Sequence, residues 1–196
     1  MSAVTIAEAW PKPGEPFTVE DLEQMPDDGR RYELIDGMLI VSPAAAPLHQ
    51  RVAFMLGLLL EEACPEDLVV FGTPVNVRFS SHSALEPDVS VARVADAQGA
   101  RARLTGTPLL VAEVLSPDSG LRDLNLKKAA YERFGIPSYW VVDPDVDRPA
   151  LRVFELSEEG AYAEVARVSG AETFRTSKPF SVEIVPDRLV AKWRRG

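Results

Sequence analysis

Apolar residues recur at helical spacing in one long stretch of the chain. Between residues 48 and 63 they lie three and four positions apart, so a helix would gather them on one broad face. The residues on this face are Leu48, Val52, Met55, Leu56, Leu59, Leu60 and Ala63. We therefore predict a helix over 48–63 that packs against the core. We also predict a short helix over 18–25 and a helix over 123–134, with Asp123 as N-cap and Gly135 as C-cap residue.

Turn residues between two apolar, β-prone runs predict a hairpin near the N-terminus. The runs cover residues 31–35 and 38–41, and Asp36-Gly37 lies between them. A two-residue type I′ turn needs positive φ at both central residues, which Asp-Gly adopts readily.

Several other segments alternate in polarity or are apolar throughout, as strands are. They lie at residues 68–71, 75–80, 87–92, 109–115, 139–142, 151–156 and 162–168, and the last two flank a Glu-Glu-Gly turn. Segment 87–92 alternates and predicts a half-buried strand, whereas 109–115 is nearly all apolar and predicts a strand buried on both faces. We predict a loop over 93–107, a turn over 117–120, and one more strand after residue 170.

The order of these elements predicts an α/β fold with helices packed on a central mixed sheet. The chain has 196 residues, of which 46% are hydrophobic, and this suits one domain with an ordinary core. We predict an N-terminal arm over 1–17, a single domain over 18–190 and a C-terminal tail over 191–196.

Charge and cysteine content narrow the classes of function. Basic residues number 21 and acidic residues 30, and the net charge of −9 argues against a protein that coats nucleic acid with its whole surface. One cysteine and two histidines exclude an internal disulfide and a zinc site built from these residue types. No segment is apolar over the length that a membrane helix needs, and the N-terminus lacks the apolar core of a signal peptide. We therefore expect a cytoplasmic protein without a membrane partner.

One charged residue interrupts the most apolar predicted strand. Glu113 lies within residues 109–115, where an unpaired buried carboxylate would be costly. A salt bridge to an arginine, or an edge position open to water, would explain Glu113 without a function. A functional interpretation is equally open if Asp88, which follows Pro87 at the start of another strand, converges on it. Two carboxylates, waters and the carbonyl oxygen of Leu115 would then suit Mg²⁺.

Four other polar residues have both a structural and a functional interpretation. Lys127 and Tyr131 lie about one turn apart on a predicted helix, and Lys127 either extends to solvent or reaches the carboxylates. Glu33, in the first hairpin, is either exposed or part of a site. His49, at the start of the long helix, is either a cap or surface group or a residue that supports catalysis.

Five motifs occur in the order and with the spacing of a known family. They are residues 32–37 (YELIDG), 87–91 (PDVSV) and 113–117 (EVLSP), Asp123 with Lys127 and Tyr131, and Gly135-Ile136 followed by residues 139–143 (YWVVD). On these motifs the chain resembles the Uma-two family of bacterial proteins, which are regarded as endonucleases of the PD-(D/E)XK, restriction-endonuclease-like superfamily. The resemblance implies a restriction-endonuclease-like core, with a central mixed sheet flanked by helices and the catalytic residues on a central β-hairpin.

The same resemblance implies roles for individual residues. Asp88 matches the motif aspartate and Glu113 the second acidic metal ligand, with Mg²⁺ or Mn²⁺ as the cofactor. The superfamily has a lysine two residues after that acid, but Leu115 occupies the position in this chain. Lys127 matches a lysine that the family carries on the next helix, and Glu33 matches the family's N-terminal glutamate.

Two functions are consistent with these residues. The first is a metal-dependent endonuclease that hydrolyses phosphodiester bonds in nucleic acid, with DNA as the expected substrate. The second is a non-catalytic module that keeps the nuclease fold and binds nucleic acid or protein, which the net charge of −9 favours modestly. A homodimer would suit cleavage of two antiparallel strands, and a partner protein could supply specificity. Arginines that we consider for phosphate contacts are Arg30, Arg31, Arg101, Arg103 and Arg122.

Overall fold

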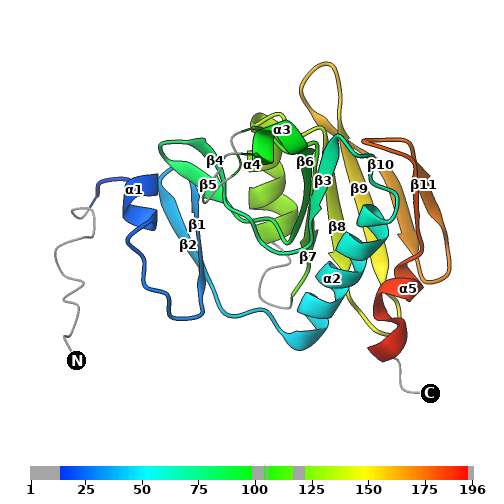
Figure 1. Cartoon of the computed structure of the whole chain (residues 1–196). Coiled ribbons are helices and arrows are strands. Elements are labelled where there is room, and N and C mark those ends of the chain that lie inside the picture. Colours follow the sequence, from blue (N-terminus) through cyan, green and yellow to red (C-terminus); the bar gives the residue numbers. More distant parts are fainter. Residues whose placement is uncertain (1–13, 99–103, 105, 117–121, 194–196) are drawn as a thin grey trace. The chain divides into compact units, whose positions relative to one another are not determined.

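The structure is a computed structural model that describes residues 14–98, 104, 106–116 and 122–193 (Figure 1). Contacts along the chain define two compact units. The smaller unit comprises Met1–Ala44 and Asn76–Glu86, and the larger unit comprises Ala45–Val75 and Pro87–Gly196. Each unit is therefore built from two separate stretches of the chain, and Asn76–Glu86 of the smaller unit lies between the two stretches of the larger unit. The predicted division into an arm, one domain over 18–190 and a tail stays a prediction.

The smaller unit is built on a four-stranded sheet with the strand order β2-β1-β5-β4. Its elements are α1 (Val19–Leu22), β1 (Arg31–Ile35), β2 (Met38–Ser42), β4 (Val77–Ser80) and β5 (Ser83–Leu85). Thr18 is the N-cap of α1, and its side chain accepts a hydrogen bond from the Asp21 N–H. Asp36 and Gly37 have φ angles of 51° and 78°, so the predicted hairpin turn is confirmed.

The larger unit is built on a six-stranded sheet with the strand order β10-β9-β8-β7-β6-β3. Its strands are β3 (Leu68–Phe71), β6 (Val89–Arg93), β7 (Leu110–Val114), β8 (Ser138–Asp143), β9 (Ala150–Leu156) and β10 (Tyr162–Ser169). β7 and β8 pair in parallel and the other neighbours are antiparallel, so the sheet is mixed, as predicted. The remaining elements are α2 (Pro47–Glu61), α3 (Val94–Ala97), the π-helical segment η2 (Arg122–Lys127), α4 (Lys128–Arg133), β11 (Phe174–Thr176), β12 (Val182–Ile184), α5 (Pro186–Val190) and the 3₁₀ turn η3 (Ala191–Trp193).

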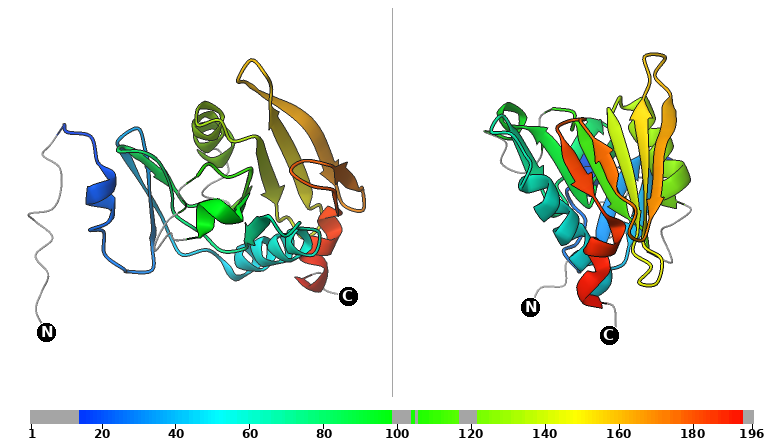
Figure 2. Two further views of the ribbon diagram at one scale, coloured as in Figure 1. Left: turned by 45° about the horizontal axis from the view of Figure 1, so that its top comes forward. Right: turned by 90° about the vertical axis from the view of Figure 1, so that its right-hand side faces the viewer.

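Different helices cover the two faces of the six-stranded sheet. Figure 2 shows α2 and α5, in cyan and red, on one side and α4, in yellow-green, on the other. On the first face, apolar side chains of α2, α5 and the β11–β12 hairpin pack on strand residues such as Val91 and Trp140. On the second face, the ring of Tyr131 on α4 lies 5.2 Å from that of Tyr139 on β8. Because successive strand residues point to opposite faces, Tyr139 packs on α4 while Trp140 packs on Phe174 of β11 on the other face.

Helix cover on both faces explains why one burial prediction is wrong. The alternation in residues 87–92 predicted a half-buried strand, yet Asp88 and Ser90 are buried along with the valines between them. α4 shields the face on which these polar residues lie, so alternation of polarity did not mean access to water. The prediction for β7, buried on both faces, is confirmed.

Three short segments also differ from their predictions. The predicted loop 93–107 contains α3, in which the Gln98 N–H bonds to the Val94 carbonyl. The predicted strand 75–80 begins at Val77, and β5 follows it, too short to show a period in the sequence. The chain after residue 170 forms β11, β12 and α5, where one strand was predicted. The predicted turn over 117–120 lies outside the described residues.

The predicted helix over 123–134 is present in two parts. Arg122–Lys127 is π-helical, and the regular helix α4 follows it. Asp123 therefore lies within the π-helical segment, and the N-cap of α4 is Lys127, so the N-cap prediction is wrong. The side chain of Asp123 lies outside the described part of the chain. Gly135 has a φ of 73°, and its predicted role at the end of the helix is confirmed.

Candidate active site

Asp88 and Glu113 lie next to each other where β6 pairs with β7. The register pairs Val89 with Ala112, which sets Asp88 opposite Glu113 one position further along. Side chains at directly opposite positions lie on the same face of a sheet, with their Cβ atoms about 5 Å apart. Each of the two residues is only 1% exposed. The larger unit thus brings two carboxylates together in its interior.

One oxygen of Asp88 accepts hydrogen bonds from two donors. The Val114 N–H, at the end of β7, lies 2.8 Å from Oδ2, and Nε2 of His49, on α2, lies 3.0 Å from the same oxygen. His49 is only 7% exposed, and the N-cap of its helix is Ala46. The interpretation of His49 as a cap or a surface group is therefore wrong. The backbone donor at Val114 was not predicted, because a main-chain N–H leaves no signal in the residue pattern.

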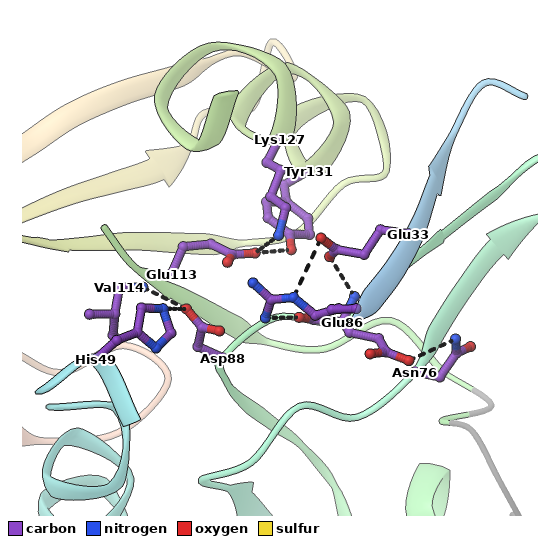
Figure 3. Close-up of polar contacts among 10 residues, drawn as sticks. Glu33, His49, Asn76, Glu86, Asp88, Glu113, Val114, Lys127 and Tyr131 are labelled. Carbon is purple, nitrogen blue, oxygen red and sulfur yellow. Dashed lines mark hydrogen bonds and ion pairs between the residues drawn. The ribbon is translucent and has the colours of Figure 1, made fainter. Parts of the chain in front are cut away.

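One oxygen of Glu113 also has two donors, and both come from the helix that covers this face. Nζ of Lys127 lies 2.9 Å from Oε1, and the hydroxyl of Tyr131 donates to the same oxygen at 2.7 Å (Figure 3). Lys127 is 1% exposed and Tyr131 is fully buried. Lys127 therefore does not extend to solvent, and the cation beside Glu113 is a lysine, where an arginine was the structural expectation.

Lys127 stands at a junction between two helix types. It is the last residue of η2 and the N-cap of α4. A π-helical turn contains more residues than an α-helical turn, so it rotates the residues that follow it about the helix axis. Such turns are rare in proteins, and those that do occur are often found at functional sites. At this junction Lys127, Ala130 and Tyr131 form the buried side of the helix.

α4 is held on the sheet by the β9–β10 hairpin. The hydroxyl of Tyr162 donates to the Ile136 carbonyl at 2.8 Å, and the Tyr162 N–H donates to the Glu132 carboxylate. Nζ of Lys128 lies 5.0 Å from the ring centre of Phe154. Burial, assisted by the charge on Glu132, raises the pKa of Tyr162, so its hydroxyl stays protonated and serves as a donor. These contacts fix α4 on the sheet.

The donors of this site suit a hard divalent cation. Mg²⁺ takes oxygen ligands and keeps several waters, so one or two protein carboxylates are enough to hold it. Asp88 and Glu113 provide these carboxylates, and the carbonyl of Leu115 lies two residues after Glu113. No group of three or more His, Cys, Asp or Glu within the described ranges is arranged to hold a metal ion. The residues therefore fit a two-carboxylate site completed by water and substrate, and not a cage made of protein ligands alone.

Glu33 lies on β1 of the smaller unit and is fully buried there. Its Oε1 accepts a hydrogen bond from the Glu86 N–H at 2.9 Å, and Nε of Arg31 lies 3.8 Å from its Oε2. Arg31 also donates from Nη1 to the Glu86 carbonyl at 3.2 Å. Figure 3 includes these contacts. The interpretation of Glu33 as an exposed strand residue is therefore wrong.

The structure does not gather the arginines considered for phosphate contacts into one surface within the part it describes. Arg101, Arg103 and the side chain of Arg122 lie outside the described residues. Arg30 is exposed and pairs with Asp28 at 3.5 Å. Arg31 is engaged by Glu33 and Glu86, as described above.

The fold is that of a nuclease-like α/β protein, with a central mixed sheet flanked by helices. A solved structure described as a "putative nuclease belonging to DUF820" from Anabaena variabilis ATCC 29413 superposes with a TM-score of 0.68 at 16% identity. The match covers 90% of this chain and 98% of that chain. At this identity the likeness establishes the fold, and it agrees with the predicted restriction-endonuclease-like core.

The chain belongs to the Uma2 family, whose model is described as "Putative restriction endonuclease" and matches residues 19–189. The resemblance drawn from the five sequence motifs is thereby confirmed. Membership supports a nuclease function in general terms. Among curated proteins, nothing matches this chain. None of the described helices is long and apolar enough to cross a membrane.

Proposed function

We propose that this chain is a metal-dependent endonuclease that hydrolyses phosphodiester bonds in nucleic acid, with DNA as its substrate. The observation that carries the proposal is the buried pair Asp88 and Glu113, with the Lys127 ammonium on one of the two carboxylates. Removing carboxylates and a lysine from water costs free energy, so a functional reason for their burial is expected. Family membership supports the same reaction class.

In this proposal Asp88, Glu113 and the Leu115 carbonyl hold Mg²⁺ or Mn²⁺. Such an ion lowers the pKa of a bound water and neutralises charge on the scissile phosphate. Lys127 would donate from Nζ, either to orient the attacking water or to stabilise the extra charge on the phosphate. Tyr131 holds Oε1 of Glu113 in place by its 2.7 Å hydrogen bond.

Cleavage assays on matched variants test the proposal. The substrates are supercoiled and linear duplex DNA, single-stranded DNA and RNA, each with Mg²⁺, Mn²⁺ or EDTA. We expect cleavage that needs the divalent ion and that falls by about 10²–10³-fold in Asp88→Asn, Glu113→Gln and Lys127→Met. Glu158→Gln, at an exposed turn position, is the matched control and should cleave normally.

The second candidate is a non-catalytic module that retains the nuclease fold. The observation in its favour is that Lys127 and Tyr131 already satisfy one oxygen of Glu113 within the protein. This function predicts nucleic-acid or protein binding without cleavage under every metal condition. It also predicts that Glu113→Gln leaves binding unchanged. Cleavage abolished by Asp88→Asn would exclude it.

Glu33 is assigned to catalysis by resemblance to the family. Its buried carboxylate, held by a backbone N–H and an arginine, supports a defined role. Glu33→Gln removes the charge and keeps the shape, so a fall in cleavage with unchanged thermal stability would support the assignment. Unchanged cleavage would restrict Glu33 to the fold of its own unit.

Assembly, phosphate contacts and location in the cell also belong to this proposal. A homodimer would pair two sites for the two strands of a duplex, and a partner protein would supply sequence specificity. Sedimentation of the protein with and without a DNA duplex tests the dimer. Arg31, Arg101, Arg103 and Arg122 stay candidates for phosphate contacts, and the cytoplasm is the proposed location.

A further inference from the structure

His49 contacts Asp88 from α2, which covers the face of the six-stranded sheet opposite to α4. It is the third residue of α2, and its Nε2 lies 3.0 Å from Oδ2 of Asp88. Figure 3 shows the imidazole beside the Asp88 carboxylate, next to Val114. Glu113 is contacted by Lys127 and Tyr131, from the end of η2 and from α4, so different helices contact the two carboxylates.

The surroundings of His49 indicate which ring nitrogen is the donor. An ionised carboxylate only accepts hydrogen bonds, so Nε2 carries the hydrogen that is shared with Asp88. Nδ1 is buried and makes no hydrogen bond within the described ranges. A hydrogen on Nδ1 would therefore be a buried donor without an acceptor, which is unfavourable. Both considerations favour the same tautomer, with the hydrogen on Nε2.

The start of α2 favours a carboxylate at this position. Ala46 is the N-cap and makes no side-chain hydrogen bond, and the first turn of α2 contains no acidic residue. A helix N-terminus carries partial positive charge and favours nearby anions. Asp88, bonded to a side chain of the first turn, supplies that anion from another element.

Two donors on one oxygen restrict how Asp88 can turn. The Val114 N–H and His49 Nε2 both bond to Oδ2, and they come from β7 and α2. A quarter-turn of the carboxylate about its Cβ–Cγ bond would break both hydrogen bonds. The orientation of the Asp88 carboxylate is therefore set by the protein.

We propose that His49 is a positioning residue that fixes the Asp88 carboxylate in the orientation needed to bind the divalent cation. The proposal rests on the metal-dependent function proposed above and adds a residue that does not itself touch the metal. Partners that orient a metal-binding side chain commonly contribute 10–100-fold to metal affinity. We expect a contribution of about this size from His49.

Three substitutions separate the donor from the packing of the ring. His49→Gln can place an amide N–H near the position of Nε2, whereas His49→Asn places its amide nearer the position of Nδ1, and His49→Ala removes both. Titration calorimetry with Mg²⁺ and with Mn²⁺ gives the affinity of each folded variant. We expect His49→Asn and His49→Ala to bind about 10–100-fold more weakly than the wild type, and His49→Gln to recover most of the loss.

A second measurement does not depend on metal binding. The chain has only two histidines, so ¹⁵N spectra of the imidazole rings resolve His49 from His82. In the metal-free protein, we expect Asp88→Asn to shift the His49 resonances and to leave those of His82 unchanged. His82→Ala assigns the signals and serves as the control in calorimetry.

The outcomes distinguish this proposal from the function on which it rests. Wild-type affinity in His49→Ala would overturn the positioning role and leave the metal-dependent function intact. Equal losses in His49→Gln and His49→Ala would also overturn it, because packing alone would then explain the effect. Absence of metal binding in the wild type would overturn the proposed function. In that case the ¹⁵N comparison still tests the hydrogen bond between His49 and Asp88. Unchanged His49 resonances in Asp88→Asn would refute that hydrogen bond.

Discussion

Glu113 and Lys127 form an ion pair in the core of the larger unit, and each is 1% exposed. The gain from such a pair is offset by the cost of removing both charges from water, so its net effect on stability is small. Removal of one partner is different, because it leaves the other charge buried without compensation. The pair therefore makes stability depend on both residues together.

We predict that Lys127→Met lowers the free energy of unfolding by about 3–5 kcal/mol. The double variant Lys127→Met/Glu113→Gln should recover a large part of this loss, since no charge is then left in the core. Urea denaturation of both single variants and the double variant forms a double-mutant cycle. Additive effects would contradict the prediction, because independent sites show no coupling.

Tyr131 supplies the other hydrogen bond to Glu113, at 2.7 Å. Hydrogen bonds to charged groups contribute about 1.5–3 kcal/mol, and Tyr131→Phe should destabilise the protein by about this amount. Thermal and urea denaturation measure the change. Tyr32→Phe is the matched control, because its hydroxyl donates to Asp28 at the surface and its loss should have little effect.

At the scale of elements, α4 depends on the turn that ends it. Gly135 has a φ of 73° and precedes the strand that lies beneath the helix. Gly160, in the β9–β10 turn, has a φ of 79°. An added Cβ would meet no atom within 4 Å at either position, so only the backbone conformation is strained by a substitution.

We predict that Gly135→Ala and Gly160→Ala each lower the free energy of unfolding by about 1–2 kcal/mol, because both force alanine into the left-handed region. Only Gly135→Ala should also reduce cleavage, since it alters the helix that presents Lys127. Denaturation and cleavage measured on the same preparations test this. Equal loss of cleavage in both variants would contradict the prediction, because the loss would then not depend on α4.

The β9–β10 hairpin carries a charge cluster that responds to pH. Hydrogen bonds from Arg167 and Arg152 lower the pKa of Glu164 from 4.5 to about 2. A carboxylate with a depressed folded-state pKa stabilises the protein above its unfolded-state value, and this contribution is lost as the pH falls through the folded-state value. The stabilisation is modest, because the cluster is partly exposed.

We therefore predict that Glu164→Gln is less stable than the wild type at pH 6, and that the difference shrinks as the pH falls from about 5 to 2. Urea denaturation at a series of pH values measures it. Glu158→Gln, at an exposed turn position of the same hairpin, is the control. A difference that does not change with pH would exclude the charge cluster as its cause.

At the scale of the whole molecule, the net charge of −9 opposes any approach to nucleic acid. A divalent ion held by Asp88 and Glu113 would reduce this repulsion at the candidate active site, where the phosphate would bind. We predict that affinity for a labelled duplex falls about tenfold or more when EDTA replaces Ca²⁺, and that Asp88→Asn abolishes the difference. Fluorescence anisotropy at constant ionic strength measures both. Equal affinity with Ca²⁺ and EDTA would contradict the prediction.

Local patterns were enough to predict most elements of this chain. The apolar face over 48–63, the Asp36-Gly37 turn and the apolar run around Glu113 each reflect a rule that acts over a few residues. Residue pattern also singled out Asp88, Glu113 and Lys127 as candidates, and the motifs of the family then gave them roles. These predictions depended on residue type and spacing alone, which is why they could be made before any packing was known.

Burial and partnership of the polar residues depended on contacts between distant parts of the chain. Residue pattern left Lys127, His49 and Glu33 open to a surface interpretation, because a polar side chain has the same sequence signal whether or not it is covered. Pairing of β6 with β7 set Asp88 opposite Glu113, and packing of α4 and α2 brought Lys127 and His49 to them. Each contact joins residues far apart in the sequence, so it was decided by strand register and helix packing.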